Sequence, residues 1–290
     1  MRYVQLRAFH YVAVCGGFSR AAEALCLTQP AISDQVRKLE EEYDVILFNR
    51  HKKQVSLTSA GQRLLEISHR MFEVEKQALE LLSESRALRA ESLRVVADSA
   101  HHMLHILGRF RERYPDVGMV VSAGNSEEVI AQLYDYEAEI GILGEMPKGR
   151  DFETIKLSST PLIAFTNTEH PLSKRKKITL AELCDQFLVL RERGSKTRQS
   201  VEAAAQARGL KLKPAIEAEG REAVREIVAT SGGVGVVSSA EFGQDPRLVP
   251  IRLSDCELLM DEALVCLRER AGGKVIRAFF ETAREVAAAG

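Results

Sequence analysis

Two short helical segments separated by a break constrain the fold of this chain more than any other feature of its sequence. The first segment holds two adjacent small residues, Ala21 and Ala22, which let another helix approach closely, and Ser19 is placed to cap it. After the break, Thr28 can cap a second helix whose first turn contains Pro30, where a missing N–H group costs little. A short helix, a tight turn and a second helix predict a helix-turn-helix.

The second helix has one apolar and one polar face. Its predicted buried stripe follows a 4-3-4 spacing and consists of Ile32, Val36, Leu39 and Tyr43. The residues on the other face, predicted to remain exposed, are Gln29, Ser33, Asp34 and Arg37. The major groove of DNA accepts one helix, whose N-terminal residues must present hydrogen-bonding atoms to base edges. Gln29 can pair with adenine, Ser33 with a donor or an acceptor, and Arg37 with guanine or phosphate. The pattern predicts a helix that reads double-stranded DNA.

A basic hairpin follows the second helix. The segment LFNRHKKQVSLT, residues 47–58, is predicted to form a wing with Arg50, Lys52 and Lys53 at or near its tip. Cations at such a tip are placed to hold the DNA backbone or to enter the minor groove. Residues 1–58 hold eight Lys and Arg against six Asp and Glu, whereas the whole chain carries a formal charge of -1. The position of these cations therefore matters more than their number.

One long helix is predicted to follow the wing, over residues 59–89. Eight residues repeat at a 3-4 spacing along it: Leu64, Ile67, Met71, Val74, Ala78, Leu81, Ser85 and Leu88. An unbroken seam of this kind is typical of two helices wound around each other, so we expect self-association. The alternative is an amphipathic helix packed on its own domain. Because Ala78 and Ser85 are small, further contacts between copies are expected elsewhere.

From Leu93 onward, apolar runs alternate with amphipathic helical patterns. The runs predicted as strands are LRVVAD, GMVVSA, IGIL, LIAFT, FLVLR, PAIEAE, VGVVSS, LVPIRL and ALVCL. This alternation predicts βαβ units and a largely parallel sheet. The region spans about 200 residues, more than one small sheet needs, so we expect two α/β lobes. The predicted fold class is therefore a helical winged domain joined to an α/β region.

Length and composition exclude several classes of protein. The chain has 290 residues, of which 45% are hydrophobic and 28% charged, so cores can form and global disorder is excluded. No apolar stretch approaches the ~18 residues of a membrane span, and no signal peptide is recognised. The five cysteines are far apart without a C-x-x-C motif, which argues against a disulfide framework or a zinc site. We expect a cytoplasmic protein without a membrane partner.

Two lobes that close on a ligand must supply polar groups from strand ends and helix starts. The candidates of this kind are Ser99, His101, His102, Ser126, Glu145, Thr160, Ser195, Lys196, Thr197 and Arg221. The segment Gly194–Arg198 combines helix N–H groups, two hydroxyls and two cations, which suit a phosphate, phosphonate or carboxylate. Glu145 can balance a ligand ammonium. Together they predict a small anionic or zwitterionic ligand, while ordinary helix capping and a surface acid remain the alternatives.

Metal binding and catalysis have weaker signals. His101 and His105 lie four residues apart on one helix face, but no third ligand at a matching spacing follows, so we predict no metal and no other cofactor. A hydrolase that uses Asp98, Ser99 and the histidines is the main rival function, yet no G-x-S-x-G, H-E-x-x-H or P-loop motif is present. A cysteine redox sensor also remains open, without a pair that marks it. A regulator without catalytic activity is favoured.

Residues 9–65, FHYVAVCGGFSRAAEALCLTQPAISDQVRKLEEEYDVILFNRHKKQVSLTSAGQRLL, closely resemble the winged helix-turn-helix of LysR-type transcriptional regulators. The likeness covers nearly the whole chain and is most specific in residues 3–67. It implies a dimer or tetramer on promoter DNA, with a small-molecule coinducer held between two lobes similar to those of periplasmic binding proteins. It also implies three domains: a DNA-binding domain over 1–58, a linker helix over 59–89, and an effector-binding domain over 90–290. In the last, lobe I covers about 90–160 and 265–290, and lobe II about 161–264.

The resemblance also assigns individual positions. Gln29, Pro30 and Ser33 match the groove-facing positions of the family, whereas Asp34 stands where many relatives have Arg, and a carboxylate near phosphates is unfavourable unless it accepts from a cytosine amine. Cys26 replaces a polar residue of the turn and is interpreted as a small buried filler. The residues that match family cleft positions are Ser99, Ser126, Ser195 and Thr197. The segments DSAHH and GSKTRQ also look like those of LysR relatives associated with aminoethylphosphonate catabolism.

Overall fold

The computed structural model describes residues 1–51, 54–82, 92–99, 103–147 and 149–289. The chain divides into two compact units, an N-terminal unit over Met1–Glu84 and a C-terminal unit over Ser85–Gly290. Within the described part of the chain, none of the helices combines the length and the apolar character needed to cross a membrane.

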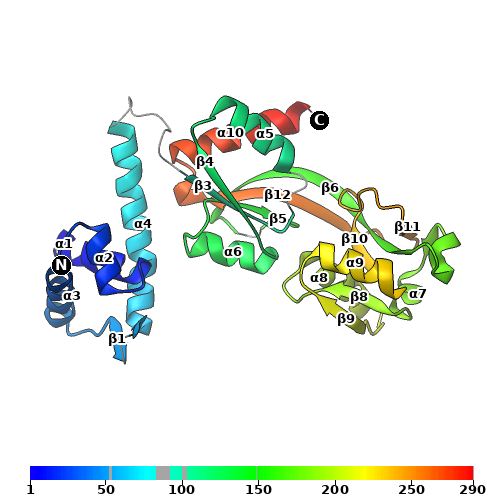
Figure 1. Ribbon diagram of the computed structural model, residues 1–290, viewed down its shortest axis with the longest axis horizontal. Helices are drawn as coiled ribbons and strands as arrows, with labels where there is room; N and C mark the ends of the chain where they lie inside the picture. Colours follow the sequence, from blue (N-terminus) through cyan, green and yellow to red (C-terminus); the bar gives the residue numbers. More distant parts are fainter. Residues whose placement is uncertain (52–53, 83–91, 100–102, 148, 290) are drawn as a thin grey trace. The chain divides into compact units, whose positions relative to one another are not determined.

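The N-terminal unit is a winged helix-turn-helix followed by a long helix (Figure 1). Its elements are α1 (Tyr3–Val14), α2 (Phe18–Ala24), α3 (Gln29–Tyr43), β1 (Phe48–His51), β2 (Gln54–Leu57) and α4 (Ser59–Leu82). Ala21 and Ala22 are buried where α2 meets its neighbours, as small residues at a close helix crossing require. Phe9 and Val12 from α1 and Ile32, Val36 and Leu39 from α3 complete one core.

Three local predictions for this unit are wrong. Tyr43 is 53% exposed, because α3 ends there and Asp44 turns the chain with a φ of 48°, so the buried stripe stops at Leu39. Ser19 lies inside α2, whose N-cap is Gly17. Cys26 is exposed and has a φ of 54°, so it supplies the left-handed turn between the helices and does not fill the core.

Helix α4 presents one face to the winged domain. Gly61 allows the closest approach, since a Cβ there would lie 2.2 Å from the carbonyl oxygen of Leu47. The hydroxyl oxygen of Ser68, which is fully buried, lies 2.9 Å from Nδ1 of His10 on α1. Burial, and then the neighbouring His69, lower the pKa of His10 to about 4, so this histidine is neutral at pH 7. Packing on its own domain therefore accounts for this face of α4.

A second edge of α4 stays apolar and uncovered. Ile67 is 53% and Val74 is 61% exposed, and Ala78 on the same edge is exposed too. These residues belong to the predicted seam, while Leu64 and Met71 of that seam lean partly against the winged domain. The side chain of Leu81, and residues Ser85 and Leu88, lie outside the described part of the chain.

Lobe I of the C-terminal unit is a sheet covered on both faces (Figure 1). Its strands are β3 (Ser92–Ala97), β4 (Gly118–Ala123), β5 (Ile140–Leu143), β12 (Leu259–Leu267) and the first part of β6 (Phe152–Asn167). Its helices are α5 (Leu104–Arg113), α6 (Ser126–Tyr134) and α10 (Lys274–Ala289). Successive residues of a strand face opposite sides, so Val95 packs with α5 and α10 and Val96 packs with α6.

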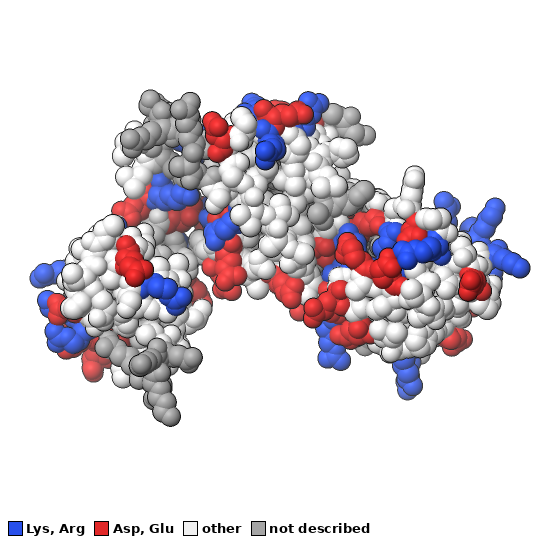
Figure 2. All heavy atoms as spheres, viewed as in Figure 1, with Lys and Arg blue, Asp and Glu red and all other residues white. Residues whose placement is uncertain are grey.

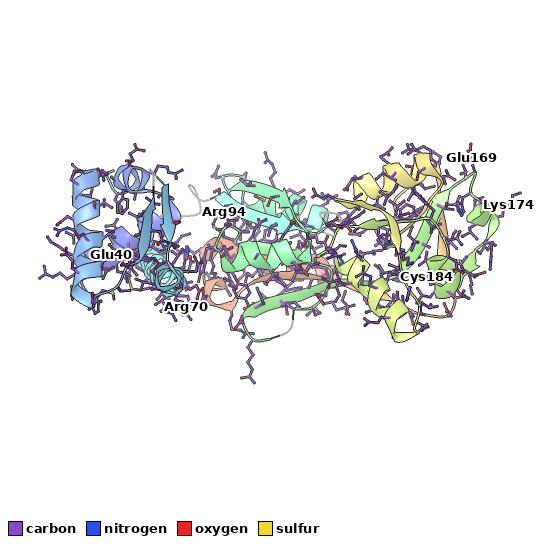
Figure 3. All side chains as sticks on the ribbon, turned by 90° about the horizontal axis from the view of Figure 1, so that it is seen from below. Glu40, Arg70, Arg94, Glu169, Lys174 and Cys184 are labelled. Carbon is purple, nitrogen blue, oxygen red and sulfur yellow. The ribbon has the colours of Figure 1, made fainter. Side chains whose placement is uncertain are left out.

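Lobe II repeats this arrangement. Its strands are β7 (Lys177–Ile178), β8 (Leu188–Arg191), β9 (Pro214–Ala218), β10 (Val234–Ser238), β11 (Leu248–Leu253) and the second part of β6. Its helices are α7 (Leu180–Cys184), α8 (Lys196–Ala207) and α9 (Arg221–Ser231). Leu188 and Leu190 pack with α7 and α8, whereas Val189 between them packs with α9. Cys184 on α7, and Glu169 and Lys174 at the far end of this lobe, can be found in Figure 3.

Two strands join the lobes. Strand β6 pairs with β12 up to Pro161 and with β10 from Leu162 onward, so ten strands form one continuous hydrogen-bonded sheet. The chain must leave lobe I and return, so β12 runs antiparallel to β6, and the sheet is mixed where a largely parallel one was predicted. The returning strand begins at Leu259, and the predicted lobe boundary near residue 264 falls inside it.

Candidate nucleic-acid interface and ligand cleft

The polar face of α3 is separate from the part of the helix that is buried. Gln29, Pro30 and Arg37 are exposed, and Ser33 and Asp34 are half-buried. At 100° per residue these five positions fall within an arc of about 140°. The buried residues Ile32, Val36 and Leu39 fall in a separate arc of about 60°, next to the Gln29 end of the polar arc. The helix begins at Gln29, so the unpaired N–H groups of its first turn lie beside this face.

Short-range ion pairs cover the middle of the α3 face. The two oxygens of Asp34 lie 2.7 Å from Arg37 and 2.6 Å from Lys38, and Arg37 also pairs with Glu41 at 2.9 Å. Hydrogen bonds from Lys38 and then Arg37 lower the pKa of Asp34. Asp34 therefore stays ionised, with two cations held within four residues of it. Exposed pairs of this kind contribute little to stability and exchange partners readily.

The end of α3 is tied to the wing. One carboxylate oxygen of Glu40, labelled in Figure 3, accepts from the backbone N–H groups of Leu47 and Phe48 at 2.8 and 3.2 Å. Strands β1 and β2 then pair from Phe48↔Leu57 to His51↔Gln54. The predicted tip residues Lys52 and Lys53, and the side chain of Arg50, lie outside the described part of the chain.

A cavity of about 750 Å³ opens between the two lobes of the C-terminal unit, a size typical of a small-molecule site. It is lined by residues that follow β3, β4, β8 and β9 and by the start of α9. Ser99 and Arg221 are the predicted site residues that line it.

Two arginines of lobe II reach across this cleft to one dipeptide of lobe I. Nη1 of Arg191 lies 3.1 Å from Oδ1 of Asp98, and both side chains are less than 9% exposed. Arg221 donates to the Ser99 hydroxyl at 2.6 Å and to the Asp98 carbonyl at 2.7 Å. Arg191 also pairs with Glu192, and Arg221 with Glu241. Burial opposes the charge of Arg191, but its bonds to Glu192 and the charge of Asp98 leave its pKa raised.

Ser126 supports this contact from behind. It is 3% exposed and donates to Oδ2 of Asp98 at 2.9 Å. The preceding Asn125 caps α6 by accepting from two backbone N–H groups, which fixes the start of that helix. Ser99, Ser126 and Arg221 are therefore brought together around Asp98, which the sequence also marked at the end of the first strand and as part of the rival hydrolase site.

The other predicted cleft residues do not line this cavity. Glu145 and Lys196 form an ion pair with each other at 2.5 Å, so their charges are already balanced. Thr160 shares a hydrogen bond of 2.6 Å with Ser238 where the strands cross between lobes. Ser195 is fully buried, and Thr197 borders a much smaller void beside Arg191 and Arg221. His101 and His102 lie outside the described residues.

Sequence reasoning missed several charged residues of the cleft: Arg191, Glu192, Arg225 and Glu241. Arg191 closes the predicted strand FLVLR, so its place at a strand end was the one available signal. Arg225 donates to the Phe242 carbonyl and lies over the Phe242 ring, in the segment that also carries Glu241. Nothing local marks Glu241, because its partner Arg221 is 20 residues away.

A buried carboxyl group lies close to this network. Glu262 on β12 is 1% exposed, and its Oε2 has no hydrogen-bond partner among the described residues. Burial, and then the charges of Glu241 and Asp98, raise the pKa of Glu262 to about 9, while Arg221 opposes the shift. Glu262 is therefore protonated at pH 7. No group of three or more His, Cys, Asp or Glu residues in the described chain could hold a metal ion.

The charges of the cleft are layered. Its inner part holds three arginines, Arg191, Arg221 and Arg225, against three carboxylates, Asp98, Glu192 and Glu241. Its rim adds three exposed acids from both lobes: Glu128, Glu219 and Glu222. Figure 2 shows acidic and basic side chains mingled on the face of lobe II next to lobe I. The inner network is balanced and the rim is negative.

Comparison with known proteins gives consistent matches. Residues 3–62 match the family described as bacterial regulatory helix-turn-helix protein, lysR family, and residues 86–288 match the LysR substrate binding domain. The chain is 33% identical over 236 residues to a RuBisCO operon transcriptional regulator of Allochromatium vinosum, covering 81% of this chain and 78% of that protein. It is 29% identical over 255 residues to the HTH-type transcriptional activator CmpR of Synechocystis sp., covering 87% and 84% of the two chains.

Solved structures share the fold. A full-length OxyR variant from Pseudomonas aeruginosa superposes with a TM-score of 0.81 at 22% identity, over 98% of this chain and 95% of that one. Full-length CbnR in complex with its target DNA gives a TM-score of 0.63 at 20% identity, over 98% and 99% of the two chains.

Proposed function

The chain belongs to the LysR family of bacterial transcriptional regulators, and from that premise we propose which surface reads DNA and what kind of molecule the cleft senses. It is a ligand-responsive DNA-binding regulator of LysR type, and its relatives are regulators, not enzymes. Regulators of this family bind promoter DNA and a small-molecule effector and form oligomers. We propose that this regulator acts in the cytoplasm.

The polar face of α3 is proposed to enter the major groove. The observation that carries this proposal is the exposure of Gln29 beside half-buried Ser33 at the start of α3, outside its buried stripe. Gln29 and Ser33 would read base edges, and Pro30 would shape the first turn. Arg37 would exchange Asp34 and Glu41 for a phosphate or a guanine. Arg50, Lys52 and Lys53 of the wing would hold the DNA backbone.

Duplex binding measured across salt concentrations tests this assignment. We expect the full chain to prefer one promoter sequence over bulk DNA, and the logarithm of its affinity to fall linearly with the logarithm of salt concentration. An affinity with neither sequence preference nor salt dependence would contradict it.

Self-association is proposed to use the exposed edge of α4. Ile67, Val74 and Ala78 are apolar, exposed and aligned, and a second copy would cover them. A dimer would present two reading helices to two half-sites. Replacing Val74 by Glu should weaken the association measured by sedimentation, whereas the same change at exposed Leu104 in the C-terminal unit should not.

The cleft is proposed to bind a small zwitterion, with 2-aminoethylphosphonate as the leading candidate. Its inner arginines suit an acid group, and the acids Glu128, Glu219 and Glu222 at its rim suit an ammonium group. This assigns the ammonium to the rim, since Glu145 is engaged by Lys196. Ser99 and Arg221 would contact the acid group, and Ser126 would support it. Thr197 and Ser195 lie behind this position and would not contact the ligand.

A thermal-shift screen separates this ligand from its alternatives. Binding to the folded state raises the melting temperature, so 2-aminoethylphosphonate should shift it more than ethylphosphonate, which lacks the ammonium group. A larger shift with β-alanine would favour a sensor of carboxylates or amino acids. Equal melting curves with and without 2-aminoethylphosphonate at millimolar concentration would overturn the phosphonate assignment.

A further inference from the structure

Three bonds that join the lobes across the cleft go to one dipeptide of lobe I. Asp98 and Ser99 follow β3 in lobe I, and they receive three bonds from two arginines of lobe II. Among the described residues, Lys196 with Glu145 and Gln199 with Glu127 also bridge the lobes, at more exposed positions. Since buried ion pairs are screened far less than exposed ones, the pair of Arg191 with Asp98 dominates.

The donors of Arg191 are divided between the lobes. Its Nε and Nη2 bond to the neighbouring Glu192 of the same lobe, at 3.0 and 2.6 Å to the nearer oxygens. Its Nη1 is the donor that reaches Asp98 in lobe I. A carboxylate on this donor has the charge and the acceptor geometry of a ligand acid group. In this conformation Asp98 occupies the position that an acidic ligand would need.

We propose that Nη1 of Arg191 anchors the acid group of the effector and that Asp98 is a built-in competitor for that donor. This inference rests on the proposed sensor function of the cleft. When the effector acid takes Nη1, the Asp98 carboxylate is displaced toward Ser126. The neighbouring bonds from Arg221 to the same dipeptide then weaken, and lobe I is released from lobe II. The effector therefore loosens a closed cleft.

The surrounding charges favour this exchange. A displaced carboxylate needs a donor, and the Ser126 hydroxyl already bonds to the second oxygen of Asp98. Glu192 keeps Arg191 neutralised from its own lobe, so the arginine is not left unpaired during the exchange.

The test uses inorganic phosphate as the acid probe and the full chain with Asp98→Asn. An amide does not compete for Arg191 as a carboxylate does, so calorimetric titration should give a phosphate dissociation constant at least about tenfold lower for D98N than for the unaltered chain. The matched control is Glu127→Gln, which removes the same charge from an exposed contact between the lobes without freeing an arginine. We expect it to change the constant less than about twofold.

Equal gains in D98N and E127Q, or no gain in D98N, would overturn the proposal. A measurement on the unaltered chain does not require the variant to fold: hydrogen exchange near residues 98–99 and 191–196 should become faster when phosphate replaces chloride at equal ionic strength. Slower or unchanged exchange there would contradict release of the lobes. Failure of either test would not affect the proposals of duplex binding and of a response to 2-aminoethylphosphonate, which are tested by their own measurements.

Discussion

Arginine–carboxylate pairs serve different purposes on α3 and in the cleft. On α3, Arg37 pairs with Asp34 and Glu41, three and four residues away, and its side chain is 55% exposed. In the cleft, Arg191 pairs with Asp98, 93 residues away, and its side chain is 8% exposed. Water competes for the first set of pairs and is excluded from the second. The same kind of ion pair therefore exchanges partners readily on α3. In the cleft it holds the two lobes together until an acidic ligand replaces Asp98.

Loss of Arg191 should destabilise the folded chain far more than loss of Arg37. Replacing Arg191 by Gln leaves the buried Asp98 and the partly buried Glu192 facing a neutral side chain, and breaking a buried pair costs about 3–5 kcal/mol. Calorimetry of the full chain should show a markedly lower unfolding transition for the C-terminal unit. Arg37→Gln, the same substitution at the exposed pair, should leave both transitions unchanged. Similar losses of stability in the two variants would show that the buried pair of Arg191 stabilises the fold no more than the exposed pairs of Arg37.

A pH titration of stability tests whether buried Glu262 holds a proton in the folded chain. The raised pKa of Glu262, near 9 in the folded chain against about 4.5 when unfolded, means that the folded state holds a proton that the unfolded chain has lost. This contribution to stability is fully present below pH 4.5 and is lost as the pH rises toward 9, by up to about 1.4 kcal/mol per pH unit. Glu262→Gln should flatten the decline in melting temperature.

Glu219→Gln at the exposed rim is the control for this titration, and it should keep the slope of the unaltered chain. The groups that face Glu262 are Glu241 and Asp98, which raise its pKa, and Arg221, which lowers it. Parallel pH curves for E262Q and the unaltered chain would show that Glu262 does not hold the proton.

A smaller effect is expected from the exposed ion pairs on α3. Asp34→Asn releases Lys38 and leaves Arg37 paired with Glu41 alone, so Lys38 becomes available to phosphates. Melting should not change, whereas affinity for bulk DNA should rise about threefold and its salt dependence should steepen by about one phosphate contact. Asp116→Asn, an equal charge change in the C-terminal unit, should alter neither quantity. A loss of affinity in D34N would indicate that Asp34 itself accepts from a base.

Sequence reasoning succeeded where structure is set by neighbours along the chain. Helical spacing predicted the buried residues Ile32, Val36 and Leu39, and each of the nine apolar runs overlaps a strand. These signals repeat every two or 3.6 residues, so they can be seen without knowledge of the fold. The same reasoning failed at Tyr43 and Cys26, where the end of a helix and a left-handed turn overrode the pattern.

The cleft was harder to predict because its partners are far apart in sequence. Glu145 and Lys196 were each recognised as charged groups near a cleft, but only the fold shows that they bind each other. Arg191 and Glu262 are single letters at the end or inside of apolar strands, and Asp98, which acts on both, lies about 90 and about 160 positions away from them. The first part of β6, with its many polar residues, was missed as a strand for a similar reason: it is stabilised by pairing with β12.

In this proposal, α3 reads bases with Gln29 and Ser33, while the wing binds DNA without regard to sequence. Binding of Gln29→Ala, Ser33→Ala and Lys52→Ala to the promoter duplex and to bulk DNA measures this directly. The first two variants should lose about tenfold or more on the promoter and little on bulk DNA, and K52A should weaken both alike. Equal losses by all three variants on both duplexes would contradict the account.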